Sequence, residues 1–289
     1  MPITLLETPR DALQGLPQFV PTAEKIAFIE AILACGFPTV DFGSFVSPKA
    51  IPQMADSAEV HAAIAPLAKK QGVELLAIVA NARGLDDGLK LGVRAFGFPF
   101  SVSDAFQQRN TNKSIAETWP LLIEMGKTAR AANARLVLYL SMAFGNPYHE
   151  PFTPAALTDF ARRCAEAGFT DLSLADTIGA ASPALVNALL GNVARALPDA
   201  KLGVHFHCRP ERANEMVEAA LDAGITWFDC ALGGVGGCPF AQDELVGNLA
   251  TPALVEFLES RGEKTGVNRA AMQTANQTAM TLAMKYGKR

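Results

Sequence analysis

The 289-residue sequence lacks any apolar run close to the roughly 20 residues that a membrane-spanning helix needs. Its longest apolar runs are short and are interrupted by glycine, proline or charged residues. The N-terminus has no basic stretch followed by an apolar one, so we expect no signal peptide. No block of five or more like charges occurs, and the net charge is −4. We therefore expect neither a membrane nor a nucleic acid as a partner.

Charged residues are scarce, at 19% of the chain, whereas hydrophobic residues make up 49%. This composition excludes a disordered chain and allows a large buried core. Cysteine is also rare, its number is odd, and no two cysteines are spaced as Cys-x-x-Cys. A chain of this length does not need disulfide bonds for stability, so we expect reduced thiols and a cytoplasmic protein. The five cysteines are Cys35, Cys164, Cys208, Cys230 and Cys238.

One local pattern recurs along the chain: a helical segment ends at a glycine and leads into a short apolar strand. The residue after the last helical turn adopts a left-handed conformation, which glycine and then asparagine tolerate best. The glycines in this position are Gly36, Gly72, Gly92, Gly168 and Gly224, and Asn133 replaces glycine in a sixth copy.

Helix starts are marked as well. A hydroxyl residue followed by proline, as at Thr153, Ser182 and Thr251, predicts a capping side chain ahead of a first-turn proline. Ser114 and Glu117 have the spacing of a capping box, in which each side chain bonds to the other's backbone amide.

These signals divide the chain into eight repeats of a strand and a helix. The strands are rich in β-branched residues, leucine and phenylalanine, which is typical of strands buried on both faces. We expect strands at residues 3–7, 39–42, 74–79, 95–98, 135–140, 171–174, 202–205 and 226–231. We expect helices near residues 22–35, 52–70, 84–91, 114–132, 153–167, 182–196, 210–223 and 251–261.

Eight β/α units with short links and no change in composition predict an α/β fold, a single (β/α)8 TIM barrel over residues 1–289. The alternative is an open doubly wound sheet. That fold usually has fewer strands and a glycine-rich nucleotide loop after its first strand, where this chain has Pro9, Arg10 and Asp11. Residues 266–289 have helical composition, and we expect them to form a short extension on the outside of the barrel.

Catalytic groups of such barrels stand at the C-terminal ends of the strands. His205 and His207 occupy this position on the seventh expected strand, and their spacing of two lets both rings point to one side where the strand ends. Two neutral imidazoles together with carboxylate and amide oxygens make a site for a divalent metal. The alternative is a structural pair of histidines. Because the chain has only four histidines and two stand together at the catalytic rim, we favour the metal site.

Arg10 and Asp11 follow the first expected strand. Asp11 is a candidate metal ligand and Arg10 a fixed cation that faces developing negative charge, although a surface ion pair or an acid at a helix start would have the same pattern. Cys238 follows four glycines within five positions, and a thiol in such a loop could donate or accept a proton. The alternative is a small buried cysteine in a tight turn.

Two further aspartates stand at strand ends. Asp41 ends the second expected strand, and Asp176 follows the sixth. Each could act as an acid or base, orient the histidines, or serve as a structural carboxylate at a helix start. For Asp176 the structural role is supported at least as well as the functional one.

Together these residues resemble the 3-hydroxy-3-methylglutaryl-CoA lyase family, a group of metal-dependent lyases on α/β barrels. The resemblance runs over nearly the whole chain. Its segments at residues 44–56 and 236–251 are specific to that family, whereas the Arg-Asp and His-x-His pieces also occur in related synthases and aldolases. The matching segments are residues 9–14, 44–49, 52–56, 176–179, 204–207, 236–241 and 247–251.

The resemblance implies an enzyme that cleaves a carbon–carbon bond of a 3-hydroxyacyl-CoA thioester and releases acetyl-CoA and a 3-oxo acid. It implies a divalent metal ion, Mg²⁺ or Mn²⁺, and a small-molecule acyl-CoA substrate, and because barrels of this kind often pair we expect a homodimer. The implied metal ligands are Asp11, His205, His207 and Asn248. The implied catalytic residues are Arg10, Asp11, Asp41, His205 and Cys238, and the implied substrate-binding residues are Gln14, Ser44 and Asp176.

The sequence also departs from the family pattern. The family usually has glutamate where this chain has Asp41, aspartate where it has Cys208, and cysteine where it has Asn146. The first loop, residues 12–17, is more apolar than usual and lacks a lysine. Since the expected metal ligands are all present, we retain the lyase chemistry, and the altered first loop predicts an acyl group that is bulkier or differently branched.

Two other functions fit parts of the pattern. A condensing enzyme or aldolase that acts on 2-oxo acids shares the Arg-Asp and His-x-His pieces, but such synthases usually carry an additional C-terminal region. A metal-binding homologue without catalysis is conceivable because of the changes at Asp41 and Cys208. It would bind metal and turn over no acyl-CoA.

Overall fold

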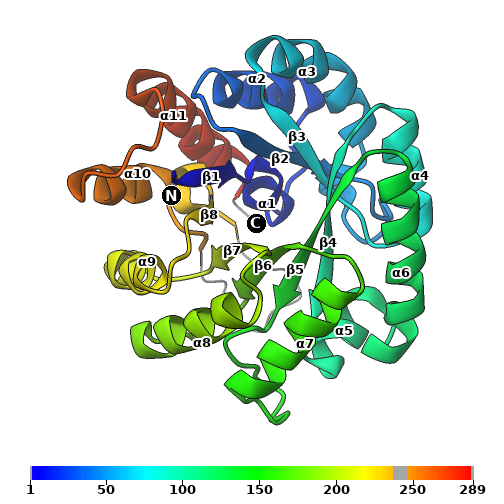
Figure 1. Ribbon diagram of the computed structural model, residues 1–289. Helices are drawn as coiled ribbons and strands as arrows, with labels where there is room; N and C mark the ends of the chain where they lie inside the picture. Colours follow the sequence, from blue (N-terminus) through cyan, green and yellow to red (C-terminus); the bar gives the residue numbers. More distant parts are fainter. Residues whose placement is uncertain (1, 237–246, 288–289) are drawn as a thin grey trace.

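The computed structural model describes residues 2–236 and 247–287. Its eight strands pair in parallel in the order β1 to β8, and β8 pairs with β1, so that the sheet closes into a barrel surrounded by helices (Figure 1). The (β/α)8 barrel that the sequence predicts is thereby confirmed, and the open sheet is excluded. The strands are β1 (Thr4–Glu7), β2 (Thr39–Ser44), β3 (Glu74–Ile78), β4 (Ala95–Ser101), β5 (Arg135–Ser141), β6 (Asp171–Asp176), β7 (Lys201–Phe206) and β8 (Trp227–Cys230).

Helices follow the strands around the outside of the barrel. They are α1 (Pro9–Gln14), α2 (Thr22–Leu33), α3 (Ser57–Gln71), α4 (Ala82–Lys90), α5 (Asp104–Thr111), α6 (Ile115–Ala131), α7 (Pro154–Glu166), α8 (Pro183–Ala196), α9 (Ala213–Asp222), α10 (Thr251–Ser260) and α11 (Arg269–Tyr286). The described residues also include three short 3₁₀ turns, η1 (Pro52–Met54), η2 (Pro210–Arg212) and η3 (Leu232–Gly234). No helix in the described part of the chain is long and apolar enough to cross a membrane.

The helix ends match the glycine pattern of the sequence. All six residues that we expected in the left-handed conformation have positive φ angles, from 51° at Asn133 to 91° at Gly92. An L-residue with a β-carbon is strained in this region, so each glycine fixes where its helix stops and the next strand begins. These short turns keep each helix packed against the strands that it connects.

The helix starts match the sequence in all but one case. Thr153 and Ser182 accept hydrogen bonds from amides in the first turns of α7 and α8, and Ser114 and Glu117 form the expected capping box at α6. The cap expected at Thr251 is wrong. The Thr251 hydroxyl donates instead to the buried carboxylate of Glu7 at 2.5 Å, because a buried acid across the barrel wall competes for it more strongly than a partly solvated helix end.

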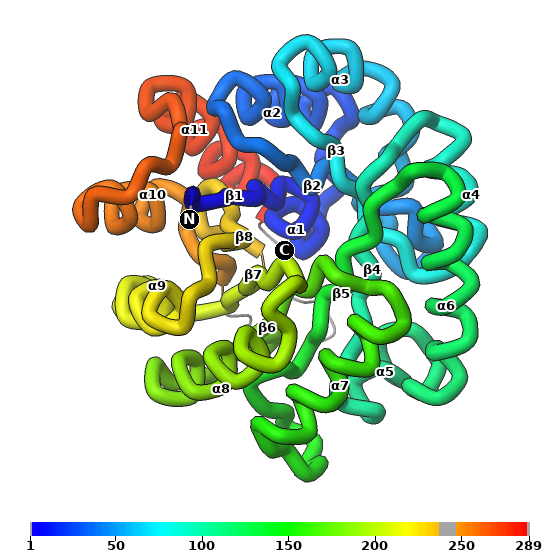
Figure 2. The backbone as a smooth tube through the Cα atoms, viewed as in Figure 1, coloured from blue at the N-terminus to red at the C-terminus, as the bar shows by residue number. Residues whose placement is uncertain are grey.

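Two helices were not expected from the sequence. α1 has only six residues, and α5 only eight, which is too short for a helical period to stand out. The expected C-terminal helical extension is present as α11. It packs against α2 and so completes the ring of helices beside the N-terminal strand (Figure 2).

The barrel interior holds a core of its own, separate from the layer between strands and helices. Trp227 fills the lower part of the lumen, and a β-carbon at Gly203 of β7 would lie 2.3 Å from its indole ring. The Arg135 guanidinium lies 5.9 Å from the centre of this ring and bonds to Glu74 and Asp171 at 2.7 and 3.0 Å. The barrel is therefore closed at the bottom. The buried side chains of this inner core are Leu6, Leu76, Ala95, Val137, Tyr139 and Trp227.

A buried glutamate on the first strand bonds to segments that follow the last strand. Glu7 of β1 is fully buried and accepts hydrogen bonds from the Leu232 amide at 2.7 Å and from the Thr251 hydroxyl. Burial raises the pKa of Glu7 to about 7 although these hydrogen bonds lower it. The folded protein therefore keeps the carboxyl protonated at pH values at which the unfolded chain loses the proton. The stabilisation from this proton is complete below pH 4.5 and is lost as the pH rises through about 7.

We predict that Glu7→Gln removes this pH dependence, because glutamine keeps a carbonyl for Leu232 and cannot ionise. Relative to the variant, the wild-type protein should lose about 3 kcal/mol of unfolding free energy between pH 4.5 and about 7. Urea unfolding of both proteins at a series of pH values measures this difference. A difference that stays constant over that range would show that Glu7 does not take up a proton on folding.

Candidate metal centre and active site

A cavity of about 390 Å³ opens at the C-terminal ends of the strands. The cavity is lined by residues that the sequence marked as site residues and by segments that follow β2, β3 and β4. This is the end of the barrel at which active sites of the fold are found. The expected site residues that line the cavity are Arg10, Asp11, Gln14, Ser44, His205 and His207.

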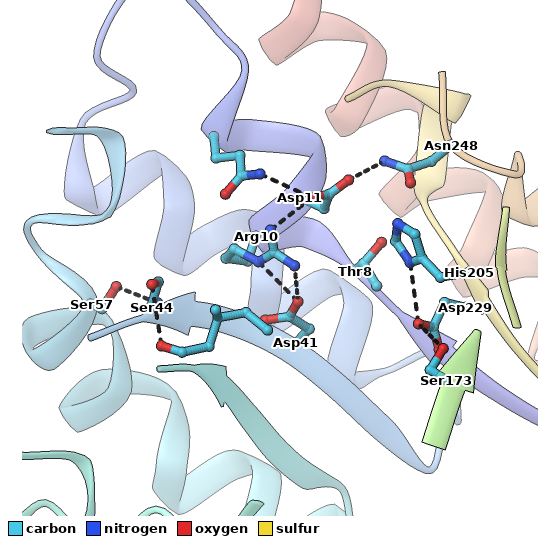
Figure 3. Close-up of polar contacts among 12 residues, drawn as sticks. Thr8, Arg10, Asp11, Asp41, Ser44, Ser57, Ser173, His205, Asp229 and Asn248 are labelled. Atoms are coloured by element: carbon cyan, nitrogen blue, oxygen red, sulfur yellow. Dashed lines mark hydrogen bonds and ion pairs between the residues drawn. The ribbon is translucent and has the colours of Figure 1, made fainter. Parts of the chain in front are cut away.

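Asp11 lies in the first turn of α1 and is buried at the centre of the polar cluster (Figure 3). One carboxylate oxygen accepts from Arg10 at 2.7 Å and from Gln14 at 3.0 Å, and the other accepts from the Asn248 amide at 2.7 Å. Burial alone would raise the pKa of Asp11, but the positive charge of Arg10, assisted by the histidines, holds it well below its usual range. Asp11 is therefore ionised at any pH at which an enzyme works.

The two histidines meet at the end of β7. Their ring centroids are 4.9 Å apart, and the Nε2 atom of His205 lies 3.3 Å from that of His207. The Nδ1 atom of His205 lies 3.2 Å from the carboxylate of Asp229. A carboxylate on this side fixes the ring so that Nε2 presents a lone pair to the cavity. His207, just after β7, pairs with Asn248 in an isolated antiparallel β-bridge.

The donor set of this cluster fits a divalent metal ion. One ligand atom each of Asp11, His205 and His207 lies within 4.8 Å of the others, and all three residues are buried. Two imidazole nitrogens facing one another beside a carboxylate are the ligand types that such ions bind in proteins. The side-chain nitrogen of Asn248 donates to Asp11 and to the Val235 carbonyl. The side-chain oxygen is therefore left as a fourth candidate metal ligand.

Arg10 is held between two carboxylates. It donates twice to one oxygen of Asp41, at 2.9 and 2.7 Å, and once to Asp11. Burial raises the pKa of Asp41 to about 6 even though Arg10 opposes this, and the second oxygen of Asp41 has no hydrogen-bond partner among the described residues. Asp41 itself is fully buried beneath Arg10. The guanidinium is therefore fixed on the cavity floor without side-chain freedom.

The other expected residues lie in different places. Ser44, the last residue of β2, donates its hydroxyl to the Ile78 carbonyl at 3.2 Å and lines the cavity. Asp176 lies outside the cavity lining and accepts from the backbone amides of Ala180 and Ala181, each at 2.9 Å. This is the structural role that the sequence left open for it. Cys238 lies outside the described residues, so its expected role stays a prediction.

Cys208, where the family usually has aspartate, is buried next to the site. Burial, together with the nearby charge of Asp176, raises the pKa of its thiol to about 11. The thiol is therefore neutral at physiological pH and is no substitute for a carboxylate. Asn146 accepts from the backbone amides of Tyr148 and Glu150 and so holds its own loop in place.

Two residues that complete the site could not be recognised from the sequence. Asp229 on β8 accepts from the Trp227 indole at 2.9 Å and bonds to His205, and so connects the filled lumen to the histidines. Tyr139 on β5 lines the cavity, and its buried hydroxyl has no hydrogen-bond partner among the described residues. Asp229 stands inside a strand rather than at its end. Only the pairing of β7 with β8, which sets His205 opposite Asp229, reveals its role.

We predict that Asp229→Asn lowers the affinity for Mn²⁺ by about 10-fold to 100-fold, the usual effect of losing the carboxylate behind a metal-binding histidine. Asparagine can no longer accept from both the Trp227 indole and His205. Titration calorimetry with Mn²⁺ measures the effect, and Asp171→Asn at the bottom of the barrel is the matched control. Equal Mn²⁺ affinity in wild type and Asp229→Asn would contradict the prediction.

Comparison with known proteins identifies relatives of similar length. The family model described as HMGL-like matches residues 3–279. The chain is 35% identical over 287 residues to the hydroxymethylglutaryl-CoA lyase of Bacillus subtilis. This match covers 99% of this chain and 94% of the relative. It is also 35% identical over 269 residues to the 3-hydroxy-3-isohexenylglutaryl-CoA/hydroxymethylglutaryl-CoA lyase of Pseudomonas aeruginosa, covering 93% and 88% of the two chains.

Solved structures agree with these sequence relatives. An HMG-CoA lyase from Acinetobacter baumannii, in complex with coenzyme A and 3-methylmalate, superposes with a TM-score of 0.90 at 29% identity. The match covers 99% of this chain and 92% of that one. The fold, the buried Asp–His–His cluster and the match over almost the whole sequence lead to one conclusion, that this chain belongs to the HMGL-like family of lyases.

Proposed function

We propose that this protein is a divalent-metal-dependent lyase that cleaves 3-hydroxy-3-methylglutaryl-CoA, or a close 3-hydroxyacyl-CoA analogue, to acetyl-CoA and a 3-oxo acid. One observation carries the proposal. Asp11, His205 and His207 form a buried cluster beside an arginine that is fixed by two carboxylates, at the active end of the barrel. Two relatives support the choice of substrate: one is solved in complex with coenzyme A and 3-methylmalate, and the other is named as a lyase of branched 3-hydroxyglutaryl-CoA thioesters.

We infer that Mg²⁺ or Mn²⁺ is held by Asp11, His205, His207 and the side-chain oxygen of Asn248. When bound there, such an ion would supply Lewis-acid stabilisation of negative charge on the substrate and help to position it. A mixed set of nitrogen and oxygen ligands without a described thiolate favours these two ions over softer metals.

Arg10 is suited to the charge that develops during cleavage. As the carbon–carbon bond breaks, its electron pair passes into the thioester and negative charge builds on the carbonyl oxygen. The Arg10 guanidinium already faces the cavity and is held by Asp41 and Asp11, so it needs no reorganisation to meet that charge. A preorganised contact of this kind contributes about 3–4 kcal/mol to the stabilisation of a transition state.

The reaction also needs two proton transfers. One group takes the proton from the 3-hydroxyl, and another delivers a proton to the carbon of the acetyl-CoA enolate. The catalytic roles that the sequence suggests for His205 and Asp41 stay predictions, because the two ring nitrogens of His205 face Asp229 and the metal cluster, and Asp41 is fully buried outside the described cavity lining. We assign the second step to Cys238, as the family resemblance implies, and this assignment stays a prediction.

The cavity wall opposite the metal cluster is apolar enough to accept a substituent larger than methyl at C3. Val46, Ala50 and Ile51 follow β2, and Phe106 of α5 lies on the same cavity. The relative from Pseudomonas aeruginosa is named for a substrate with an isohexenyl group. We therefore extend the proposed substrate range to 3-hydroxyglutaryl-CoA thioesters with longer apolar branches.

Two further expectations complete the proposal. We expect a homodimer, as barrels of this kind often pair, and light scattering of the purified protein tests this. We also expect a cytoplasmic protein. The four described cysteines are buried free thiols, which agrees with a reducing compartment.

The decisive experiment measures acetyl-CoA release from a panel of 3-hydroxyacyl-CoA thioesters with Mg²⁺ or Mn²⁺, with EDTA, and after metal is restored. We predict release from the 3-methylglutaryl thioester that EDTA abolishes and that added metal restores. Release from other thioesters alone would keep the mechanism and change the substrate. Metal binding without any release would contradict the proposal and favour an aldolase or a non-catalytic homologue.

Substrate range can be tested at Ala50, an exposed residue at the cavity mouth. We predict that Ala50→Phe lowers kcat/KM for a thioester with a long C3 branch by about 10-fold or more, because the ring occupies the space that the branch needs. Cleavage of the 3-methyl thioester should change little. Ala50→Ser, which adds little volume, is the control, and an equal loss for both substrates would show that the branch does not bind along this wall.

A further inference from the structure

The C-terminal helix holds the glycine turn that follows β8. The Gly233 amide, in η3, donates to the side-chain oxygen of Asn276 in α11 at 2.8 Å. Gly233 and Gly234 have φ angles of 77° and 60°, a left-handed turn that glycine adopts without strain. A β-carbon at Gly233 would lie 3.3 Å from the sulfur of Met280, so α11 also packs closely against the turn.

The neighbouring amide of the same turn is held from the opposite side. Leu232 donates to Glu7 of β1 at 2.7 Å. Two consecutive amides of the turn are thus bound by side chains that come from the two ends of the sequence. Since each side chain accepts a single backbone hydrogen, loss of either one would leave an amide that the other cannot satisfy.

This glycine turn also determines the position of Asn248, a residue of the metal site. Val235 directly follows η3, and its carbonyl accepts from the Asn248 side chain at 3.0 Å. The same nitrogen of Asn248 donates to Asp11. At Gly236 a β-carbon would lie 2.5 Å from this nitrogen and 2.8 Å from the Asp11 carbonyl, so the backbone after the turn fits closely against both residues.

The backbone and the side chain of Asn248 are held by different parts of the structure. Leu249 bonds to the Phe206 carbonyl at the end of β7 and to the Ala231 amide after β8, which fixes the backbone next to Asn248. The rotation of the Asn248 amide group depends on the two acceptors of its nitrogen, Asp11 and the Val235 carbonyl. Of these, the Val235 carbonyl is placed by the glycine turn.

We propose that Asn276 is a positioning residue for the metal site. By binding Gly233 it holds the Val235 carbonyl in place, and this orients the Asn248 amide so that its oxygen faces the cluster of Asp11, His205 and His207. The proposal rests on the metal site of the proposed function and on no particular substrate. It assigns α11, which contributes no residue to the described cavity lining, a part in metal binding.

The test compares Mn²⁺ binding by full-length wild type, Asn276→Ala, Asn276→Leu and Asn276→Asp in titration calorimetry. Alanine and leucine cannot accept a hydrogen bond, whereas aspartate keeps an acceptor for the Gly233 amide. We expect the first two variants to bind Mn²⁺ about 10-fold more weakly, as when other residues that support metal ligands are lost. Asn276→Asp should stay within about 2-fold of wild type.

The matched control is Asn268, which caps the start of the same helix by accepting from the Ala270 and Ala271 amides and does not contact the turn. Asn268→Ala should lower the melting temperature by about 2–4 °C and leave Mn²⁺ affinity unchanged. Melting temperatures of all variants separate this loss of stability from loss of positioning.

Three results would overturn the proposal: wild-type Mn²⁺ affinity in Asn276→Ala, no rescue by Asn276→Asp, or an equal loss in Asn268→Ala. Failure of the proposed function would look different. In that case the wild-type protein would bind Mn²⁺ and cleave none of the thioesters, while the comparison of variants by Mn²⁺ binding would still decide the role of Asn276.

Discussion

The hydrogen bond between Asp11 and Asn248 depends on the pairing of β1 with β8, because these residues stand 237 positions apart. Asp11 lies in the first turn of the six-residue helix that follows β1, and Asn248 comes after β8 in the sequence. An open sheet would place them at opposite edges. Closure of the barrel brings them together, and it sets the end of β7, where His205 and His207 lie, next to the same point. The metal site is in this sense a product of the ring topology.

The site concentrates charge that is buried, and its neighbours compensate for that burial. Arg10 shares its guanidinium between Asp41 and Asp11, so removal of Arg10 would leave both buried carboxylates without their guanidinium partner in a region that water hardly reaches. Asp229 is compensated by the Trp227 indole and by His205. Since Trp227 also packs against Gly203 in the lumen, the filled barrel interior supports the histidines from below.

Much of the fold was predictable because its signals are local. Glycine and asparagine tolerate the left-handed helix end, and hydroxyl residues bond to first-turn amides, whatever the rest of the chain does. Thr251 shows the limit of this reasoning. Its sequence has the pattern of a cap, but its hydroxyl bonds to Glu7, which lies 244 positions away. A local rule fails when a distant buried group competes for the same atom.

The sequence by itself determined the eight strand–helix units and marked Arg10, Asp11, His205 and His207, because residue types with metal and charge chemistry stood at strand ends. Tertiary structure alone decided which side chains support them. Asp229 became a partner of His205 through the register of β7 and β8, Asp176 accepts hydrogen bonds from backbone amides, and Asn276 reaches the glycine turn from the last helix. These contacts depend on how strands align and how helices pack, and neither leaves a periodic or local trace in the order of residues.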